Sequence, residues 1–113
     1  MIIKHANDVE KEVPTLAGTK GVALQWLISK KDGAENYAMR LFTLEPGGII
    51  PMHRHDDMEH QMFIVEGEAV LKTPEKEISI RTNDVLFVQT GDQHSFINNS
   101  DKPFKFICVI PLL

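Results

Sequence analysis

The feature that most constrains the fold is a series of short strand-like runs separated by turn residues, with no sustained apolar pattern at helical spacing. Gly, Pro, Asn and Asp interrupt the chain every 8–12 residues or so. The expected strands are residues 22–29, 37–45, 49–55, 60–65, 69–72, 78–81, 85–88, 94–98 and 104–110. Short strands at this spacing predict an all-β sandwich or small barrel.

The chain has 113 residues, which suffice for one domain and are too few for two of ordinary size. We expect a single barrel domain over residues 1–113, with residues 1–20 forming an N-terminal arm or edge strand and residues 21–113 the barrel. The hydrophobic share of 42% and the charged share of 25% exclude a disordered chain, a collagen and a coiled coil.

Charge and cysteine content indicate which classes of binding partner and which cellular compartment to expect. A net charge of −4 argues against a nucleic-acid or anionic-membrane surface, and no apolar run is long enough to span a bilayer. The single cysteine, Cys108, excludes an internal disulfide, and the first residues lack the apolar core of a signal peptide. We therefore expect a cytoplasmic protein that binds neither nucleic acid nor membrane.

Four of the five histidines fall close to turns, at His53, His55, His60 and His94. Residues two apart on a strand project from the same face, so His53 and His55 would aim two imidazoles in one direction. This geometry is common for two ligands of one metal ion. A solvated histidine cluster at an exposed strand end is the alternative interpretation, and spacing alone does not exclude it.

Two segments add a family resemblance. The first runs from Gly47 through His53-Arg54-His55 and His60 to Gly67, and the second is Gly91-Asp92-Gln93-His94-Ser95-Phe96-Ile97-Asn98. Their intervals resemble the two motifs of the cupin superfamily, in particular its short one-domain members with a four-histidine metal site. The resemblance implies an all-β, antiparallel double-stranded β-helix (a jelly-roll barrel) that forms a homodimer through the N-terminal arm and an outer sheet face. The apolar residues of 22–28, including Trp26, offer such a surface.

Three positions depart from the family pattern. His60 stands where the first motif usually has Glu, and strand parity allows only one of His60 and Glu59 to face the metal. His60 keeps the interval to Gly67, so we expect it to be the ligand and Glu59 to be an exposed acid or an outer partner of an imidazole. Asn83 replaces a Gly but tolerates positive φ, and Gln89 replaces a Pro.

Four imidazoles would favour one divalent transition-metal ion per chain, namely Mn, Fe, Ni, Cu or Zn, over Ca or Mg. Four neutral ligands leave the full double charge on the ion, which should attract an anionic ligand. An octahedral site would leave two open positions for chemistry, whereas a closed tetrahedral zinc site would be structural.

Strand parity also suggests which side chains line a cavity beside the histidines. The expected substrate pocket is Met62, Ile64, Phe96, Phe106 and Ile110, each of which could equally be ordinary core. Arg40 is either a surface residue or a cavity cation that orients an anionic substrate. Cys108 is either an inert buried thiol or a group near the metal that is open to oxidation. Arg40 and Cys108 are the candidate catalytic residues.

The family analogy favours a metal-dependent oxygenase or dioxygenase acting on a small enolate-like or phenolic molecule. A metal-dependent isomerase or lyase is a second enzymatic hypothesis, weakened because Tyr37 is the only tyrosine and no carboxylate is expected on the inward faces. A non-catalytic module that holds a metal or a small molecule is the alternative from a different class.

Overall fold

The computed structural model describes residues 1–113 and is built almost entirely from antiparallel strands. The strands are β1 (Lys20–Ile28), β2 (Tyr37–His53), β3 (His60–Glu66), β4 (Glu68–Lys72), β5 (Glu77–Arg81), β6 (Val85–Val88), β7 (His94–Ile97) and β8 (Phe104–Pro111). Two 3₁₀ helices, η1 (Ala6–Asp8) and η2 (Lys30–Asp32), complete the fold. Neither has the length and hydrophobicity that crossing a bilayer requires. The prediction of an all-β fold is confirmed.

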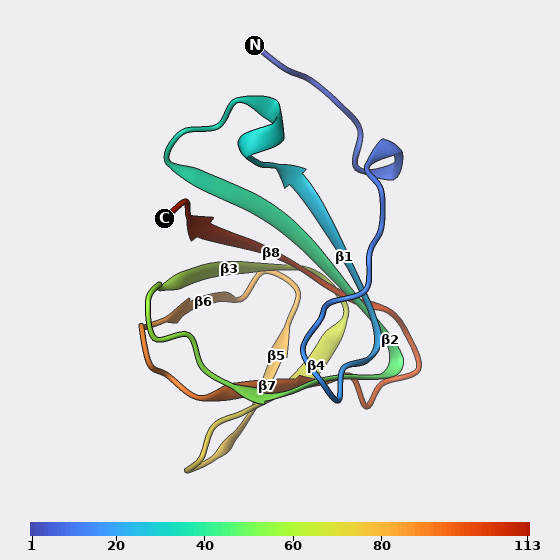
Figure 1. The fold of residues 1–113 in the computed structure, drawn as a ribbon. Coiled ribbons are helices and arrows are strands. Elements are labelled where there is room, and N and C mark those ends of the chain that lie inside the picture. Colours follow the sequence, from blue (N-terminus) through green and yellow to red (C-terminus); the bar gives the residue numbers. More distant parts are fainter.

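The strands form one curled sheet in the hydrogen-bonded order β5-β4-β7-β2-β8-β3-β6, with β1 paired to β2. Figure 1 shows the sheet rolling over itself, so that β3 and β6 lie opposite the layer that contains β7. The roll brings β5, at one end of the order, into contact with β3 near the other end. This antiparallel jelly roll is the predicted architecture, and its interior is where the inward-facing side chains meet.

Strand β2 differs from the sequence prediction, which placed a break at Pro46-Gly47-Gly48 between two strands. The structure has a single strand, Tyr37–His53, that bends at this point, where Gly47 has a φ of 83°. The first part of β2 pairs with β8 and the last part pairs with β7, so hydrogen bonding continues on both sides of the bend. The glycines therefore let one strand pass between two parts of the sheet rather than ending it.

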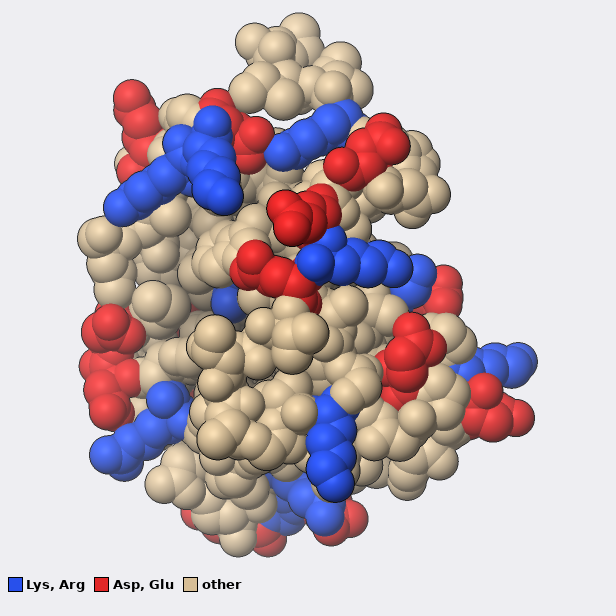
Figure 2. All heavy atoms as spheres, turned by 45° about the vertical axis from the view of Figure 1, so that its right-hand side comes forward, with Lys and Arg blue, Asp and Glu red and all other residues tan.

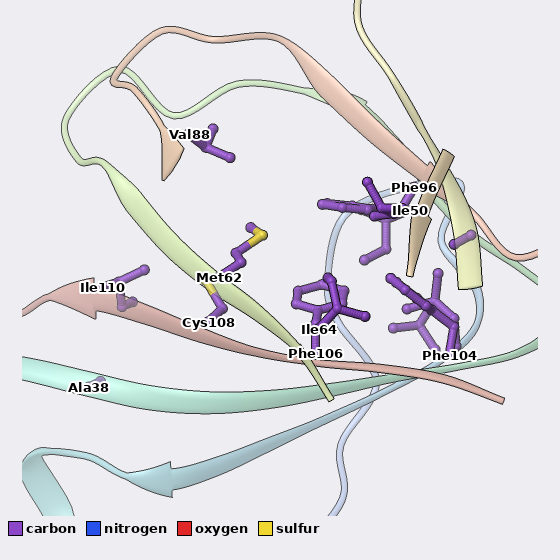
Figure 3. Close-up of a cluster of buried hydrophobic side chains, with 14 residues drawn as sticks. Ala38, Ile50, Met62, Ile64, Val88, Phe96, Phe104, Phe106, Cys108 and Ile110 are labelled. Atoms are coloured by element: carbon purple, nitrogen blue, oxygen red, sulfur yellow. The ribbon is translucent and has the colours of Figure 1, made fainter. Parts of the chain in front are cut away.

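The barrel interior is an apolar cluster drawn from β1, β2 and every later strand. In Figure 3, Phe106 and Ile64 point across the interior toward Phe96 and Ile50. The rings of Phe96 and Phe106 stack with their centroids 5.0 Å apart, which ties β7 to β8 across the cluster. This packing fixes the strands whose ends carry the histidines.

Residues 1–19 run along β1. The buried side-chain amide of Gln25 donates hydrogen bonds to the carbonyls of Ala6 (2.7 Å) and Val9 (3.0 Å), and Glu12 pairs with Leu24 through an isolated bridge. These bonds hold the segment against the sheet without making it a full strand.

Two further features follow from local sequence. Asn83 is the one non-glycine residue with positive φ (76°), in agreement with the expectation that asparagine preserves this turn. On the face drawn in Figure 2, acidic and basic side chains are interspersed without an extended patch of one sign.

Candidate metal centre

Strand ends bring four imidazoles together at one end of the barrel. His53 ends β2, His60 begins β3 and His94 begins β7, while His55 follows β2 in the loop. The ring centroids lie 4.3 Å apart for His53 and His94, 4.3 Å apart for His55 and His60, and 6.4 Å apart for His60 and His94. Since His53 and His94 are also register partners, the β2–β7 pairing itself sets part of this cluster.

Hydrogen bonds define the tautomers of two of these rings. Nδ1 of His53 lies 2.8 Å from the carbonyl oxygen of Pro51, and Nδ1 of His94 lies 2.9 Å from that of Asp92. A carbonyl oxygen only accepts, so each Nδ1 carries the proton and donates it. The Nε2 atom of each ring is then left with its lone pair, which is the form a metal ligand requires.

Burial favours the neutral form of three of these imidazoles, those of His55, His60 and His94. It lowers the pKa of His60 to about 3, helped by the charges of His55 and Arg40, and it lowers the pKa of His94 to about 4. Burial also lowers the pKa of His55, assisted by the charge of His53. His60 and His94 are each only 3% exposed. Neutral imidazoles near pH 7 can donate to a metal without first losing a proton.

No three His, Cys, Asp or Glu side chains already stand around a common point as ligands of one ion. The donor chemistry nevertheless fits a transition metal, because Nε2 of His60 is buried and has no hydrogen-bond partner. A buried polar atom without a partner costs free energy, and such atoms are rare in folded proteins. A metal ion would satisfy this atom and use the free Nε2 atoms of His53 and His94.

The imidazoles form one wall of a cavity of about 360 Å³. Of the predicted pocket residues, Met62, Phe96 and Phe106 line it. Ile64 and Ile110 are buried in the core and do not belong to the cavity lining. Strand parity thus indicates the inward face correctly for all five residues but not how far each lies from the cavity.

The two candidate catalytic residues also lie on the cavity wall, on paired strands. Arg40 on β2 is the register partner of Cys108 on β8. Its Nη2 donates to Sγ of Cys108 at 3.1 Å and lies 3.5 Å from Nδ1 of His60, while that Nδ1 is 3.3 Å from the sulfur. Burial raises the pKa of the Cys108 thiol despite the nearby guanidinium. These three side chains form one connected polar cluster.

Glu59 and His60 face in opposite directions, as strand alternation predicts. His60 is buried against the cluster, whereas Glu59 is exposed and lies with Tyr37 and Gln61 in a separate surface depression. Glu59 is therefore not placed to join the imidazoles.

Several residues of the cavity wall were not among the predicted site residues. Pro14, Thr15, Leu16 and Thr19 come from the N-terminal segment, and Phe42 and Ile50 come from β2. Phe42 follows Arg40 on the inward face of β2, so alternation could have identified it. The position of residues 14–19 depends on how the segment packs against the sheet, and the local sequence carries no such signal.

Residues 40–110 match the family model of the cupin domain, and this segment includes all four clustered histidines. The chain belongs to the cupin family. An oxalate-binding protein from Thermotoga maritima is 30% identical to this cupin over 117 residues, which cover 100% of this chain and 95% of that protein.

Two solved structures are similar over nearly the whole chain. The polyketide cyclase RemF from Streptomyces resistomycificus superposes with a TM-score of 0.93 at 27% identity, covering 98% of this cupin and 79% of that chain. A Thermotoga maritima protein described as a predicted oxalate decarboxylase superposes with a TM-score of 0.86, also at 27% identity, covering 99% and 100%. The relatives are thus described with different activities, and the fold does not choose between them.

Proposed function

We propose that His53, His55, His60 and His94 hold one divalent transition-metal ion of the Mn, Fe, Ni, Cu or Zn group. The observation that carries this proposal is the unpartnered Nε2 of His60, which lies in a cluster with three further imidazoles. The carbonyl-anchored Nδ1 atoms of His53 and His94 support it, because they leave Nε2 free in both rings. Imidazole nitrogens suit these metals better than Ca or Mg.

The cavity favours an enzyme that handles a small molecule with an anionic oxygen, of the enolate-like or phenolic kind. Bound by four neutral imidazoles, a metal ion would act as a Lewis acid or as a redox centre for such an oxygen. Around it, the side chains of Phe42, Phe96 and Phe106 give an apolar surface for the body of the ligand. Arg40 adds a positive charge to the same cavity.

Within this proposal, oxygenase or dioxygenase chemistry is favoured over isomerase or lyase chemistry. Isomerisation needs a group that moves a proton between carbon atoms of the substrate. No Asp, Glu or Tyr lines the cavity, and Tyr37, the only tyrosine, is 65% exposed on the outside of the barrel. Oxygenation places less demand on a separate carboxylate or phenol base.

A non-catalytic binding module is the second candidate. It is favoured by the Thermotoga maritima relative, which is described as an oxalate-binding protein and matches the full length of this chain. A cavity of this kind can hold a small anion without turning it over.

Metal content and oxygen consumption separate these candidates. Protein purified without chelator or nickel affinity resin should contain about one transition-metal ion per chain by elemental analysis, and a His60→Ala, His94→Ala double variant should contain none. Iron- or manganese-loaded protein should then consume dioxygen with a member of a panel of phenols and 1,3-diketones. Tight binding of a small anion without turnover would support the binding module instead. A metal-free protein that cannot be loaded would overturn the metal site.

A further inference from the structure

The three buried side-chain polar atoms that lack a hydrogen-bond partner all belong to residues of one cavity. They are Oγ1 of Thr19, Nε of Arg40 and Nε2 of His60. The proposed metal accounts for the histidine nitrogen only. Both remaining atoms can donate a hydrogen bond, so the cavity offers two further unsatisfied donors.

Arg40 is held in the cavity by the fold. It sits opposite Cys108 on β8 and Trp26 on β1, and its guanidinium carbon lies 5.3 Å from the centroid of the Trp26 ring and 5.0 Å from that of Phe42. Aromatic rings stabilise the cation and restrict it, but they do not neutralise it. The guanidinium is therefore oriented in advance of any ligand.

No carboxylate of the chain neutralises this charge. Arg40 takes part in none of the three ion pairs, and no Asp or Glu lines the cavity. The other arginine of the lining, Arg54, differs in both respects: its side chain is 55% exposed and its Nε lies 3.1 Å from Oδ1 of Asp56. A partly buried cation without a counter-ion is costly, and an anionic ligand would offset that cost.

We propose that Arg40 is the carboxylate-binding group of this cavity and that its ligand is a small carboxylic acid with an apolar body. The proposal rests on the proposed function and extends it, because the carboxylate would accompany the phenolic or enolic oxygen assigned to the metal. Nη2 of Arg40 already donates to Cys108, which leaves the Nε–H for a carboxylate oxygen. The Thr19 hydroxyl provides a second donor.

The dimensions of the cavity set the ligand size. Arg40 Nη2 lies 3.5 Å from His60 Nδ1, so the cation and one of the clustered imidazoles are immediate neighbours. Because Arg40 and the imidazole cluster are neighbours in one cavity, a compact ligand can place a carboxylate near the guanidinium and a second oxygen near the proposed metal. A volume of about 360 Å³ with phenylalanine walls accommodates one aromatic ring. A 2-hydroxybenzoate meets these requirements.

Salicylate and salicylamide provide a matched pair of probes, because they share the ring and the phenol and differ in the charge of the carboxyl group. Calorimetric titration at pH 7.5 would compare nickel-loaded wild type, Arg40→Gln, Arg40→Lys, Thr19→Val and, as a matched control, Arg54→Gln. Wild type should prefer salicylate by about 10- to 100-fold, the range expected for a hydrogen bond between charged groups. Arg40→Gln should abolish the preference, Arg40→Lys and Thr19→Val should reduce it, and Arg54→Gln should leave it within about threefold of wild type.

Equal binding of the two probes by wild type, or an undiminished preference in Arg40→Gln, would overturn the proposal. A loss of preference in Arg54→Gln as large as in Arg40→Gln would also overturn it. If circular dichroism shows that Arg40→Gln is unfolded, the binding preferences of Arg40→Lys and Thr19→Val test the proposal instead. Nickel content is measured first: a wild type without nickel contradicts the proposed metal function, and titration of that metal-free protein still tests Arg40.

Discussion

The Sγ atom of Cys108 lies 3.3 Å from Nδ1 of His60, which makes the buried thiol a neighbour of the imidazole that faces the cavity with a free Nε2. If Nε2 of His60 binds a metal, Nδ1 must carry the proton and needs an acceptor. The carbonyls of Pro51 and Asp92 serve His53 and His94 in this way. For His60, the sulfur of Cys108 would be that acceptor.

Replacing Cys108 with Ala should therefore weaken metal binding by about 10-fold or more, the lower end of the effect of losing an outer partner of a metal-bound histidine. Cys108→Ser should retain most of the affinity, because a hydroxyl oxygen also accepts. Competition with a chromophoric chelator measures both constants, and carbon-13 shifts of the His60 ring in metal-free protein report its tautomer. Equal affinities for the Ala variant and wild type would show that the thiol does not position His60.

His60, the first residue of β3, and Glu59, which precedes it, test which side chain belongs to the proposed metal site. His60→Ala should lower metal affinity by at least about 100-fold, because it removes a buried donor that faces the cluster. Glu59→Ala should change it less than threefold, since Glu59 lies in the depression outside the barrel. Metal per chain after dialysis, with melting temperature as a control for folding, distinguishes the two. The reverse pattern would mean that β3 is shifted by one residue.

The inward faces of the strands could be predicted from sequence because side chains alternate along a strand. This is why His60 and Met62, like His94 and Phe96, lie on the cavity wall. Alternation does not predict how far along the barrel an inward-facing residue lies from the cavity. Ile64 shares the inward face of β3 but is buried in the core and does not line the cavity.

Long-range packing explains what the sequence did not predict. Pro46-Gly47-Gly48 is typical of a turn, and only the pairing of β2 with both β7 and β8 turns it into a bend within one strand. The N-terminal segment reaches the cavity because Gln25 on β1 binds the carbonyls of Ala6 and Val9. The bend in β2 and the position of the N-terminal segment therefore depend on distant residues, so the local sequence of neither segment predicts them.

Stability of the metal-free protein should depend on pH through the buried histidines. The pKa values of His60 and His94 in the folded protein are about 3 and about 4, below the 6.5 of an unfolded histidine. As the pH falls below about 6.5, these two histidines become protonated in the unfolded chain but stay neutral in the folded chain. The free energy of unfolding therefore decreases.

The decrease should continue to about pH 4 for His94 and about pH 3 for His60, at up to about 1.4 kcal/mol per pH unit for each histidine. Urea denaturation between pH 7.5 and 5.5 measures it where the carboxylates stay almost fully ionised. His94→Gln should flatten the slope. A constant free energy of unfolding over this range would contradict the burial assigned to these rings.

Gly47 and Gly67 have the same φ of +83°, so comparing alanine substitutions at the two positions separates the cost of backbone strain from that of steric conflict. A Cβ at Gly47 would meet nothing within 4 Å, so Gly47→Ala should cost only the strain of positive φ, about 1–2 kcal/mol. A Cβ at Gly67 would collide with the carbonyl of Pro103 and lie 3.1 Å from Cα of Phe104. Gly67→Ala should therefore cost at least about 3 kcal/mol, which urea denaturation would show. Equal costs would mean that the β3–β4 turn can move away from β8.

The outer face of β3 and β6 is a candidate interface for the homodimer expected from the family resemblance. On this face Val85 is 75% exposed and Phe87 is 56% exposed. Their register partners on β3, Phe63 and Gln61, are also uncharged. An uncharged apolar surface can be buried against its own copy, as a two-fold dimer requires.

We therefore expect the protein to sediment as a dimer at micromolar concentration and Phe87→Glu to convert it to a monomer without lowering its metal content. Placing a charge at the centre of an apolar interface leaves it desolvated and unpaired, a cost large enough to prevent association. Val13→Glu is the matched control, because Val13 is 76% exposed but belongs to the N-terminal segment. A monomeric wild type would refute the dimer. Dissociation by Val13→Glu alone would instead assign the interface to the N-terminal segment.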